Sequence, residues 1–152
     1  MIYKIKLLEM PNQPALAIRT VTPVEILPQF FGPAYSCIMQ HLTTLGEYPA
    51  GMPYGLYFNM DMSALDVEAG FPVAKELPGN EEIKCVTIPG GKYISTIHRG
   101  AYDAVAPAYD ALTAYAKENQ LEPTGLAYEY YLNDPGSGPD VIAETEIRFP
   151  VK

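Results

Sequence analysis

Basic residues are scarce in this chain of 152 residues, which has 10 Lys and Arg against 18 Asp and Glu and a formal charge of −8. A nucleic-acid-binding surface needs clustered Lys and Arg, so the composition argues against direct binding of nucleic acid. Long apolar runs are missing as well, and no segment approaches the roughly 18 consecutive apolar residues that would span a membrane. Residues 1–10 alternate apolar and polar side chains, a pattern typical of a strand and not of a signal peptide.

Cysteine is rare and tryptophan is absent, whereas 12 Tyr and 5 Phe are present. Cys37 and Cys85 stand alone, without the spacing of a metal site or the number that a disulfide framework needs. We interpret them as structural thiols and expect a cytoplasmic protein. The sequence has no Ser-His-Asp signature, no nucleophile elbow, no phosphate loop and no cluster of metal ligands. We therefore expect neither a metal nor a cofactor.

The chain repeats itself. Five residues recur after a constant step, 123 − 49 = 74: Pro49, Gly51, Tyr54, Tyr57 and Asn59 return as Pro123, Gly125, Tyr128, Tyr131 and Asn133. The motif Phe71-Pro72-Val73 returns as Phe149-Pro150-Val151 after a longer step, 149 − 71 = 78, and the extra residues fit the Gly- and Pro-rich turn 134–139. About 150 residues is the length of one domain. We expect a single domain, 1–152, with repeat one at 1–75 and repeat two at 81–152.

Each repeat is predicted to contain two strands, a helix and two more strands. In the first, strands 2–8 and 15–20 are joined by a turn at 11–14, helix 24–45 stops at Gly46, and strands 56–60 and 67–73 follow. In the second, strands 83–88 and 93–98 flank a hairpin turn at 89–91, a helix runs from an N-cap at Asp103 to about 119, and strands 126–132 and 141–149 close the repeat. This order predicts an α+β fold: an antiparallel sheet with two helices on one face, pseudo-twofold symmetry and a ligand cleft between the repeats.

The copies differ at one position of interest, where Gly55 of the first aligns with Glu129 of the second. In a strand over 127–133, Glu129 and Tyr131 share a face, and Tyr57 is the counterpart of Tyr131. Aromatic rings and a carboxylate both favour an organic cation. Desolvation would raise the pKa of Glu129 and suit it to acid–base chemistry. The alternative is that Glu129 points to solvent, where a Lys or Tyr satisfies it.

Other polar residues have simpler interpretations. His98 either assists proton transfer or hydrogen-bonds the turn that follows it. His41 lies in the first predicted helix and is interpreted as a packing or surface residue. Asp66 and Glu68 alternate on a predicted strand and are interpreted as a solvated face.

Several short motifs, in order along the chain, resemble the GyrI-like small-molecule-binding domain, which is also the effector-binding domain of bacterial AraC-type and multidrug-responsive activators. They are Gly90-Gly91-Lys92-Tyr93, His98-Arg99-Gly100-x-Tyr102, Tyr128-Glu129-x-Tyr131-x-Asn133-Asp134-Pro135 and Phe149-Pro150-Val151. The resemblance covers essentially the whole chain. It implies two strand–helix–strand–strand repeats around a cleft, and an acidic residue in an aromatic pocket for lipophilic, often cationic, compounds. Glu129 stands at that position. Many relatives carry Trp in the second helix or in the pocket, and Tyr109 and Tyr115 are the nearest helix aromatics here.

The resemblance implies three functions. We favour a non-enzymatic binding protein for small amphipathic or cationic compounds, with Glu129 at the centre and a wall drawn from Gly55, Tyr57, Tyr93, His98, Tyr102, Tyr109 and Tyr131. The first alternative is a hydrolase of cyclopropane-bearing genotoxins, in which Glu129 activates water beside Tyr131 or Tyr109. The second is a gyrase-inhibitor-like module that binds a topoisomerase. Because the resemblance occupies the whole length, we expect no helix-turn-helix here. The chain would then be a stand-alone binder or the sensor of a transcription regulator.

Overall fold

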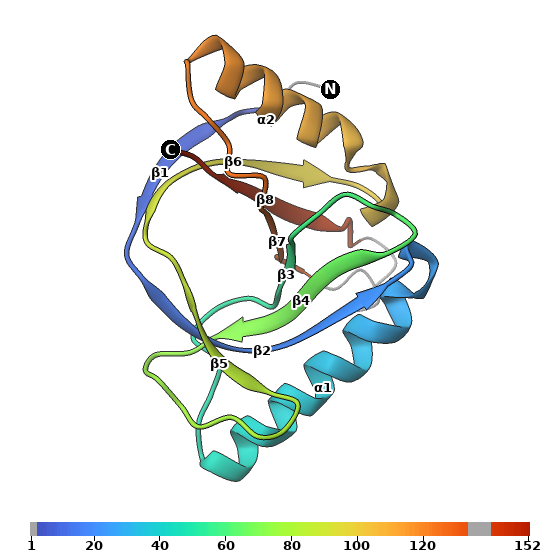
Figure 1. Cartoon of the computed structure of the whole chain (residues 1–152), viewed down its shortest axis with the longest axis vertical. Helices are drawn as coiled ribbons and strands as arrows, with labels where there is room; N and C mark the ends of the chain where they lie inside the picture. The colour runs from blue at the N-terminus through green and yellow to red at the C-terminus, as the bar shows by residue number, and fades with distance from the viewer. Residues whose placement is uncertain (1–2, 134–140) are drawn as a thin grey trace. The chain divides into compact units, whose positions relative to one another are not determined.

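The structure is a computed structural model that describes residues 3–133 and 141–152 (Figure 1). The chain forms two compact units. One, called here the Gly55 unit, comprises Pro11–Gly90. The other, the Glu129 unit, combines Met1–Met10 with Gly91–Lys152.

The Gly55 unit is a four-stranded antiparallel sheet in the order β5-β2-β4-β3, with one helix against β2 and β4. A 3-10 turn precedes the helix, and the last turn of the helix ends at Gly46, whose φ of 70° is left-handed and whose N–H donates to the carbonyls of Leu42 and Thr43. Apolar side chains of the helix, the sheet and the following loop form the core. The elements are β2 Gln13–Thr22, the 3-10 turn Val24–Ile26, α1 Leu27–Leu45, β3 Tyr54–Tyr57, β4 Leu65–Pro72 and β5 Lys84–Ile88.

The Glu129 unit has the same internal plan. Its sheet has the antiparallel order β1-β6-β8-β7, and its helix packs on β6 and β8. The helix buries Ala108, Leu112 and Ala116 on its inner side, as its apolar spacing predicts. The elements are β1 Lys6–Met10, β6 Gly91–Arg99, the 3-10 turn Tyr102–Ala104, α2 Ala106–Glu118, β7 Ala127–Tyr131 and β8 Glu144–Pro150. The α+β class is thus confirmed.

The strand pairing confirms the alignment of the two copies. Gly55 of β3 lies opposite Ala69 of β4, and Glu129 of β7 lies opposite Ile147 of β8. These pairs are related by the two steps found in the sequence, since 129 − 55 = 74 and 147 − 69 = 78. Gly55 and Glu129 therefore occupy equivalent places, each in its own unit.

The hairpin predicted at 89–91 is wrong, and the two strands joined by the turn at 11–14 do not pair with each other either. β1 pairs with β6, in a register that sets Met10 opposite Gly91, and β2 pairs with β5, in a register that sets Gln13 opposite Ile88. Each unit thus receives one strand from the other half of the sequence. Pro and Gly at 89–91 do interrupt the strands as predicted, but turn residues set only where the chain leaves a strand, whereas burial of side chains selects the partner strand.

Asp103 does not cap the second helix. It lies in the 3-10 turn, and α2 begins at Ala106 after Val105, with no side-chain cap. Pro107 accounts for this start, because proline fits the first turn of a helix, where its missing N–H has no partner to lose. Pro28 has the same place in α1, so residues 24–26 form a 3-10 turn ahead of the α-helix.

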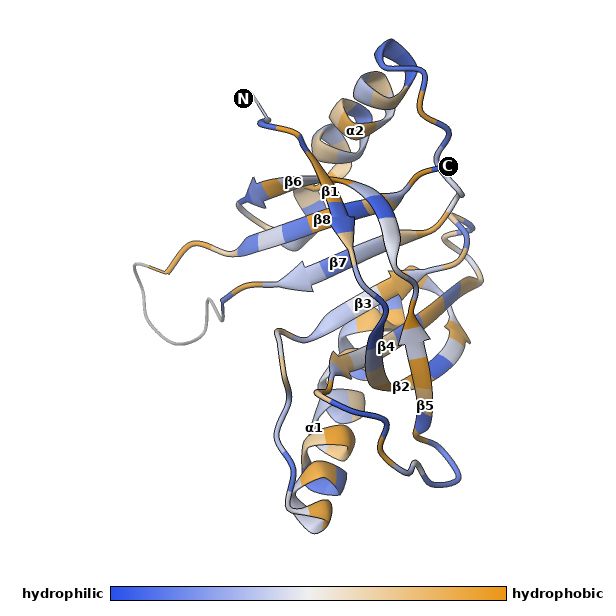
Figure 2. Cartoon of the chain, turned by 90° about the vertical axis from the view of Figure 1, so that its left-hand side faces the viewer, coloured by the Kyte–Doolittle hydropathy of each residue, from blue (hydrophilic) through white to orange (hydrophobic). Residues whose placement is uncertain are grey.

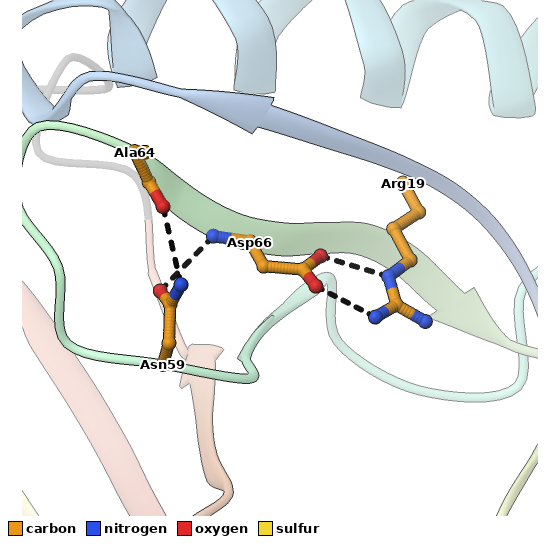
Figure 3. A network of polar contacts seen from close by, with 4 residues as sticks. All are labelled: Arg19, Asn59, Ala64 and Asp66. Carbon is orange, nitrogen blue, oxygen red and sulfur yellow. Dashed lines mark hydrogen bonds and ion pairs between the residues drawn. The ribbon is translucent and has the colours of Figure 1, made fainter.

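The repeated asparagines have a structural role. In the Gly55 unit, the Asn59 amide donates to the carbonyl of Ala64 (3.1 Å) and accepts the N–H of Asp66 (3.1 Å), as Figure 3 shows. In the Glu129 unit, Asn133 donates to Ile142 (2.6 Å) and accepts from Glu144 (2.9 Å). Each amide thus fixes the start of the next strand, which explains why asparagine recurs at this step.

Candidate functional site

Glu129 lies on β7 and is only 7% exposed. One carboxylate oxygen, Oε2, accepts a hydrogen bond from the hydroxyl of Tyr109 on α2, and Oε1 accepts one from the hydroxyl of Tyr131 at 3.2 Å. Glu129 therefore faces the helix side of its sheet. The interpretation that Glu129 points to solvent is wrong, although a tyrosine does satisfy it. Figure 2 shows why hydropathy alone would mislead here, since β7 is drawn mostly in pale colours and β8 largely in the blue of hydrophilic residues, and neither strand is uniformly orange.

Neighbouring rings hold both tyrosines in place. The ring of Tyr109 packs edge-on against Phe149 of β8, with 5.4 Å between centroids, and that of Tyr131 packs edge-on against Tyr102, at 5.5 Å. Offset and edge contacts of this kind stabilise a pair of rings by about 0.5–1.5 kcal/mol beyond their buried area. We call Tyr102, Tyr109, Glu129, Tyr131 and Phe149 the Glu129 cluster.

The environment of Glu129 opposes its charge. Burial raises the pKa of the carboxyl, and the hydrogen bonds from Tyr109 and Tyr131 lower the pKa by a smaller amount. Within residues 3–133 and 141–152, no Lys, Arg or His forms an ion pair with Glu129. The group is thus a buried acid next to two phenols and without a basic partner in the described chain. Such a group can receive a cation or exchange a proton.

The Gly55 unit contains the same aromatic framework without the acid. Tyr35, the counterpart of Tyr109, packs edge-on against Phe71 at 5.4 Å, just as Tyr109 packs against Phe149. Where no carboxylate is available, the Tyr35 hydroxyl donates to the backbone carbonyl of Tyr54 at 2.7 Å. Gly55 thus distinguishes the two frameworks chemically, as the sequence comparison predicted.

The remaining predicted site residues are distributed over both units. Tyr102, Tyr109 and Tyr131 come together around Glu129. Gly55 and Tyr57 belong to the other unit, where the ring of Tyr57 contacts Phe31 (6.5 Å between centroids), and their part in binding remains a prediction. Tyr93 lies on β6 and points to the face opposite that of Ile94 and Thr96. Its ring packs against that of Tyr128, with 6.0 Å between centroids.

His98 is buried on the Glu129 side of β6, but both ring nitrogens are engaged. Its Nε2 donates to the carbonyl of Ala101 (3.2 Å), which can only accept. Nδ1 is therefore the acceptor of the Tyr3 hydroxyl (3.0 Å). This supports the simpler interpretation, in which His98 orders the turn after β6.

Asp66 and Glu68 do not form the solvated face that their alternation suggested. Glu68 is 7% exposed, and the hydroxyl of Tyr54 donates to it at 3.1 Å. Burial raises the pKa of Glu68, an effect that the bond from Tyr54 and the charge of Arg19 reduce. The Tyr54 ring reaches this place because Gly70 has no side chain, and a Cβ there would lie 2.6 Å from the ring. Asp66 stays partly exposed and binds Arg19 through two hydrogen bonds of 2.8 and 2.7 Å (Figure 3).

Three residues of the Glu129 unit were missed by the sequence analysis: Tyr3, Phe149 as a ring partner, and Thr145, which lies opposite Tyr131. Phe149 could have been found from the recurrence of Phe71. Cys37 and Cys85 are free thiols on exposed residues and not part of a core.

In the described part of the chain, no three His, Cys, Asp or Glu side chains gather as a metal-binding group. None of the helices in that part is long and apolar enough to span a membrane.

Solved structures similar to this chain support the fold. The EcmrR–DNA complex in EcmrR-RPo matches at 24% identity with a TM-score of 0.85 over 100% of this chain, which spans only 58% of the EcmrR chain there. The C-terminal domain of EcmrR alone matches at 21% and 0.81, with 100% and 99% of the two chains covered.

Two further structures share the fold at lower identity. A hydrolase from Listeria innocua matches at 13% identity and a TM-score of 0.73, covering 98% of this chain and 92% of that one. SAV2435 bound to tetraphenylphosphonium matches at 16% and 0.60, covering 100% and 94%. No curated protein matches. The family model described as the GyrI-like small molecule binding domain matches residues 3–152. The chain therefore belongs to the GyrI-like family of small-molecule-binding domains.

Proposed function

We propose that this GyrI-like domain binds amphipathic aromatic cations at the Glu129 cluster. The observation that carries the proposal is the buried carboxyl of Glu129, held by the hydroxyls of Tyr109 and Tyr131 and without an ion pair in the described chain. A bound cation would provide the positive charge that pairs with the Glu129 carboxylate, and the surrounding rings would provide apolar and cation–π contacts.

A structural relative supports the choice of ligand class. SAV2435 was solved with tetraphenylphosphonium, a lipophilic cation whose four rings surround the charge. Each ring of the Glu129 cluster that faces such a cation would contribute roughly 0.5–2 kcal/mol when desolvated. A carboxylate in a dry site would contribute more than any one ring, because Coulomb attraction strengthens as the local dielectric constant falls.

Binding requires side chains over Glu129 to move, because the residue is buried. Tyr102 is 45% exposed and packs on the partly exposed Tyr131, so these two rings are the side chains that a ligand would displace. The chain has no Trp, and its intrinsic fluorescence therefore comes from tyrosine alone. Ligand binding should change that emission.

The proposal is tested by titrating tetraphenylphosphonium into the wild type and Glu129→Gln. The substitution should weaken binding roughly 5- to 150-fold, the loss expected for a charge-assisted contact in a desolvated site. Glu118→Gln, at an exposed residue of α2, makes the same change in net charge and should leave affinity unchanged. The neutral triphenylphosphine oxide should bind wild type and Glu129→Gln alike. Equal losses for both compounds would mean that the substitution had damaged the shape of the site.

A hydrolase is the second candidate. It is favoured by a carboxyl of raised pKa with a tyrosine hydroxyl 3.2 Å from it, and a structure of similar fold is described as a hydrolase. Glu129 would take a proton from water as the water oxygen bonds to a strained ring carbon and the ring C–C bond breaks. A tyrosine hydroxyl would stabilise the negative charge left by that electron pair, and Glu129 would then return the proton to the ring-opened product.

Mass spectrometry of a cyclopropane-bearing electrophile incubated with the protein tests this second function. A water adduct should form, and Glu129→Gln should slow its formation roughly 100-fold or more, the scale of losing a general base. No adduct above background from the wild type would leave binding as the function of the site.

A further inference from the structure

Thr145 is a fully buried residue of β8 whose hydroxyl oxygen has no hydrogen-bond partner in the described part of the chain. Buried hydroxyls in folded proteins nearly always have a partner, because an unmade hydrogen bond in the interior is costly. Within the described residues, Thr145 Oγ1 is the one buried side-chain polar atom left without one.

The sheet places Thr145 beside the Glu129 cluster. Thr145 lies directly opposite Tyr131, and Ile147, two residues further along β8, lies opposite Glu129. Residues opposite one another share a face, and diagonal neighbours remain within reach of longer groups. On its other side Thr145 faces His98, whose ring nitrogens are bound to Tyr3 and Ala101.

The other copy shows that packing does not require a threonine at this place. Its counterpart is Val67, since 145 − 67 = 78, and Val67 lies opposite Tyr57 and is also fully buried. Valine and threonine have nearly the same shape and differ by a hydroxyl in place of a methyl group. The hydroxyl and the carboxylate occur together: the Glu129 unit has Thr145 and Glu129 where the Gly55 unit has Val67 and Gly55.

We propose that the Thr145 hydroxyl recognises a hydrogen-bonding group of the ligand held by Glu129. The ligand would then be an aromatic cation that carries a hydroxyl, amino or carbonyl group, and not a cation with hydrocarbon substituents alone. A threonine hydroxyl both donates and accepts, so it suits any of these groups. This inference rests on the proposed function, because it assigns specificity to the same site.

The test compares two ligands on three proteins: tetraphenylphosphonium and its (4-hydroxyphenyl)triphenylphosphonium analogue, with wild type, Thr145→Val and Thr96→Val. Wild type should prefer the hydroxylated cation by roughly tenfold, the scale of one net hydrogen bond. Thr145→Val should bind tetraphenylphosphonium within twofold of wild type but lose the preference. Without ligand its melting temperature should be equal or higher, because an unpaired buried hydroxyl has been removed.

Thr96→Val is the matched control. Thr96 is also buried, but its hydroxyl donates to the carbonyl of Lys4 at 2.8 Å. This variant should lose stability and keep the tenfold preference, which separates recognition from a general effect of removing a buried hydroxyl.

Three results would overturn the inference alone: no preference in the wild type, an unchanged preference in Thr145→Val, or a loss of tetraphenylphosphonium binding in that variant, which would indicate damage to shape. If tetraphenylphosphonium does not bind the wild type, or binds Glu129→Gln equally well, the proposed function fails and the inference fails with it.

Discussion

Glu129 shows how far a single residue can be interpreted from sequence. Comparing the copies singled it out, because Gly55 stands at the same step, and alternation placed it beside Tyr131. Burial could not be predicted, since it depends on Tyr109, which reaches Glu129 from a helix that begins about twenty residues earlier in the chain. The exposure of Glu68 was predicted wrongly for the same reason. Alternation placed Glu68 on a polar face, but the Tyr54 ring covers that face because Gly70 leaves room for it.

Glu129→Gln should change how stability depends on pH. The pKa of Glu129 is raised in the folded state, so its contribution to stability is fully present below its unfolded pKa and is lost as pH rises through the folded pKa. The free energy of unfolding of the wild type should therefore fall relative to the variant between about pH 4 and pH 7. Urea unfolding of both proteins across this range measures it. A variant clearly less stable at pH 7 would show that the hydrogen bonds from Tyr109 and Tyr131 outweigh the cost of the buried charge.

Tyr109→Phe should shift the pH range of cation binding. The Tyr109 hydroxyl lowers the pKa of Glu129, so its loss should raise that pKa further. As pH is lowered, the variant should therefore lose affinity for the cation at a higher pH than the wild type does. The ring contact with Phe149 would be kept. Dissociation constants measured as a function of pH test this. Superimposable profiles would mean that this hydrogen bond does not control the ionisation of Glu129.

The positions of helices and strands along the sequence were predicted better than the pairing of the strands. Helix and strand locations were broadly predicted, and the two steps between the copies reproduced the register of β3 with β4 and of β7 with β8. Strand partners were not, because the Pro-Gly-Gly segment is a strong turn signal that carries no information on which strand pairs with which. The repeat of the asparagines was seen in the sequence, but its structural reason was not. Each side-chain amide forms two hydrogen bonds to the backbone at the start of the next strand.

Asn59→Ala and Asn133→Ala should each destabilise the protein by about 2 kcal/mol, because each removes two side-chain to backbone bonds of about 1 kcal/mol. Chemical denaturation measures the change. The symmetry of the two bond pairs provides an internal comparison, and a loss below about 0.5 kcal/mol in both variants would show that water replaces the amides at no cost.

The whole molecule is a duplicated chain whose two compact units each contain one strand from the other half of the sequence. This exchange was missed, because β1 lies about 80 residues before its partner β6, and no local pattern specifies so distant a pairing. The units keep equal topology but differ in chemistry, with polar Glu129 and Thr145 in one and Gly55 and Val67 in the other. That difference is the reason why we propose the Glu129 unit as the one that binds a charged ligand.

Removing residues 1–10 should expose β6 and leave β2 protected. β6 pairs with β1 on one side, whereas β2 is covered by β4 and β5. Hydrogen exchange should therefore accelerate in residues 91–95, with little change in residues 13–17. The reverse pattern would indicate that β1 forms a hairpin with β2.

The most direct test of cation binding by Glu129 is calorimetric titration of tetraphenylphosphonium at about pH 5 and pH 7 in buffers of different ionisation enthalpy. Below its raised pKa the carboxyl is protonated and must ionise to hold a cation. The wild type should therefore release protons as the cation binds, and bind more tightly at pH 7 than at pH 5. Glu129→Gln should bind weakly and release none from this site. Equal affinity and equal proton release in wild type and variant would contradict the assignment of Glu129 as the group that binds the cation.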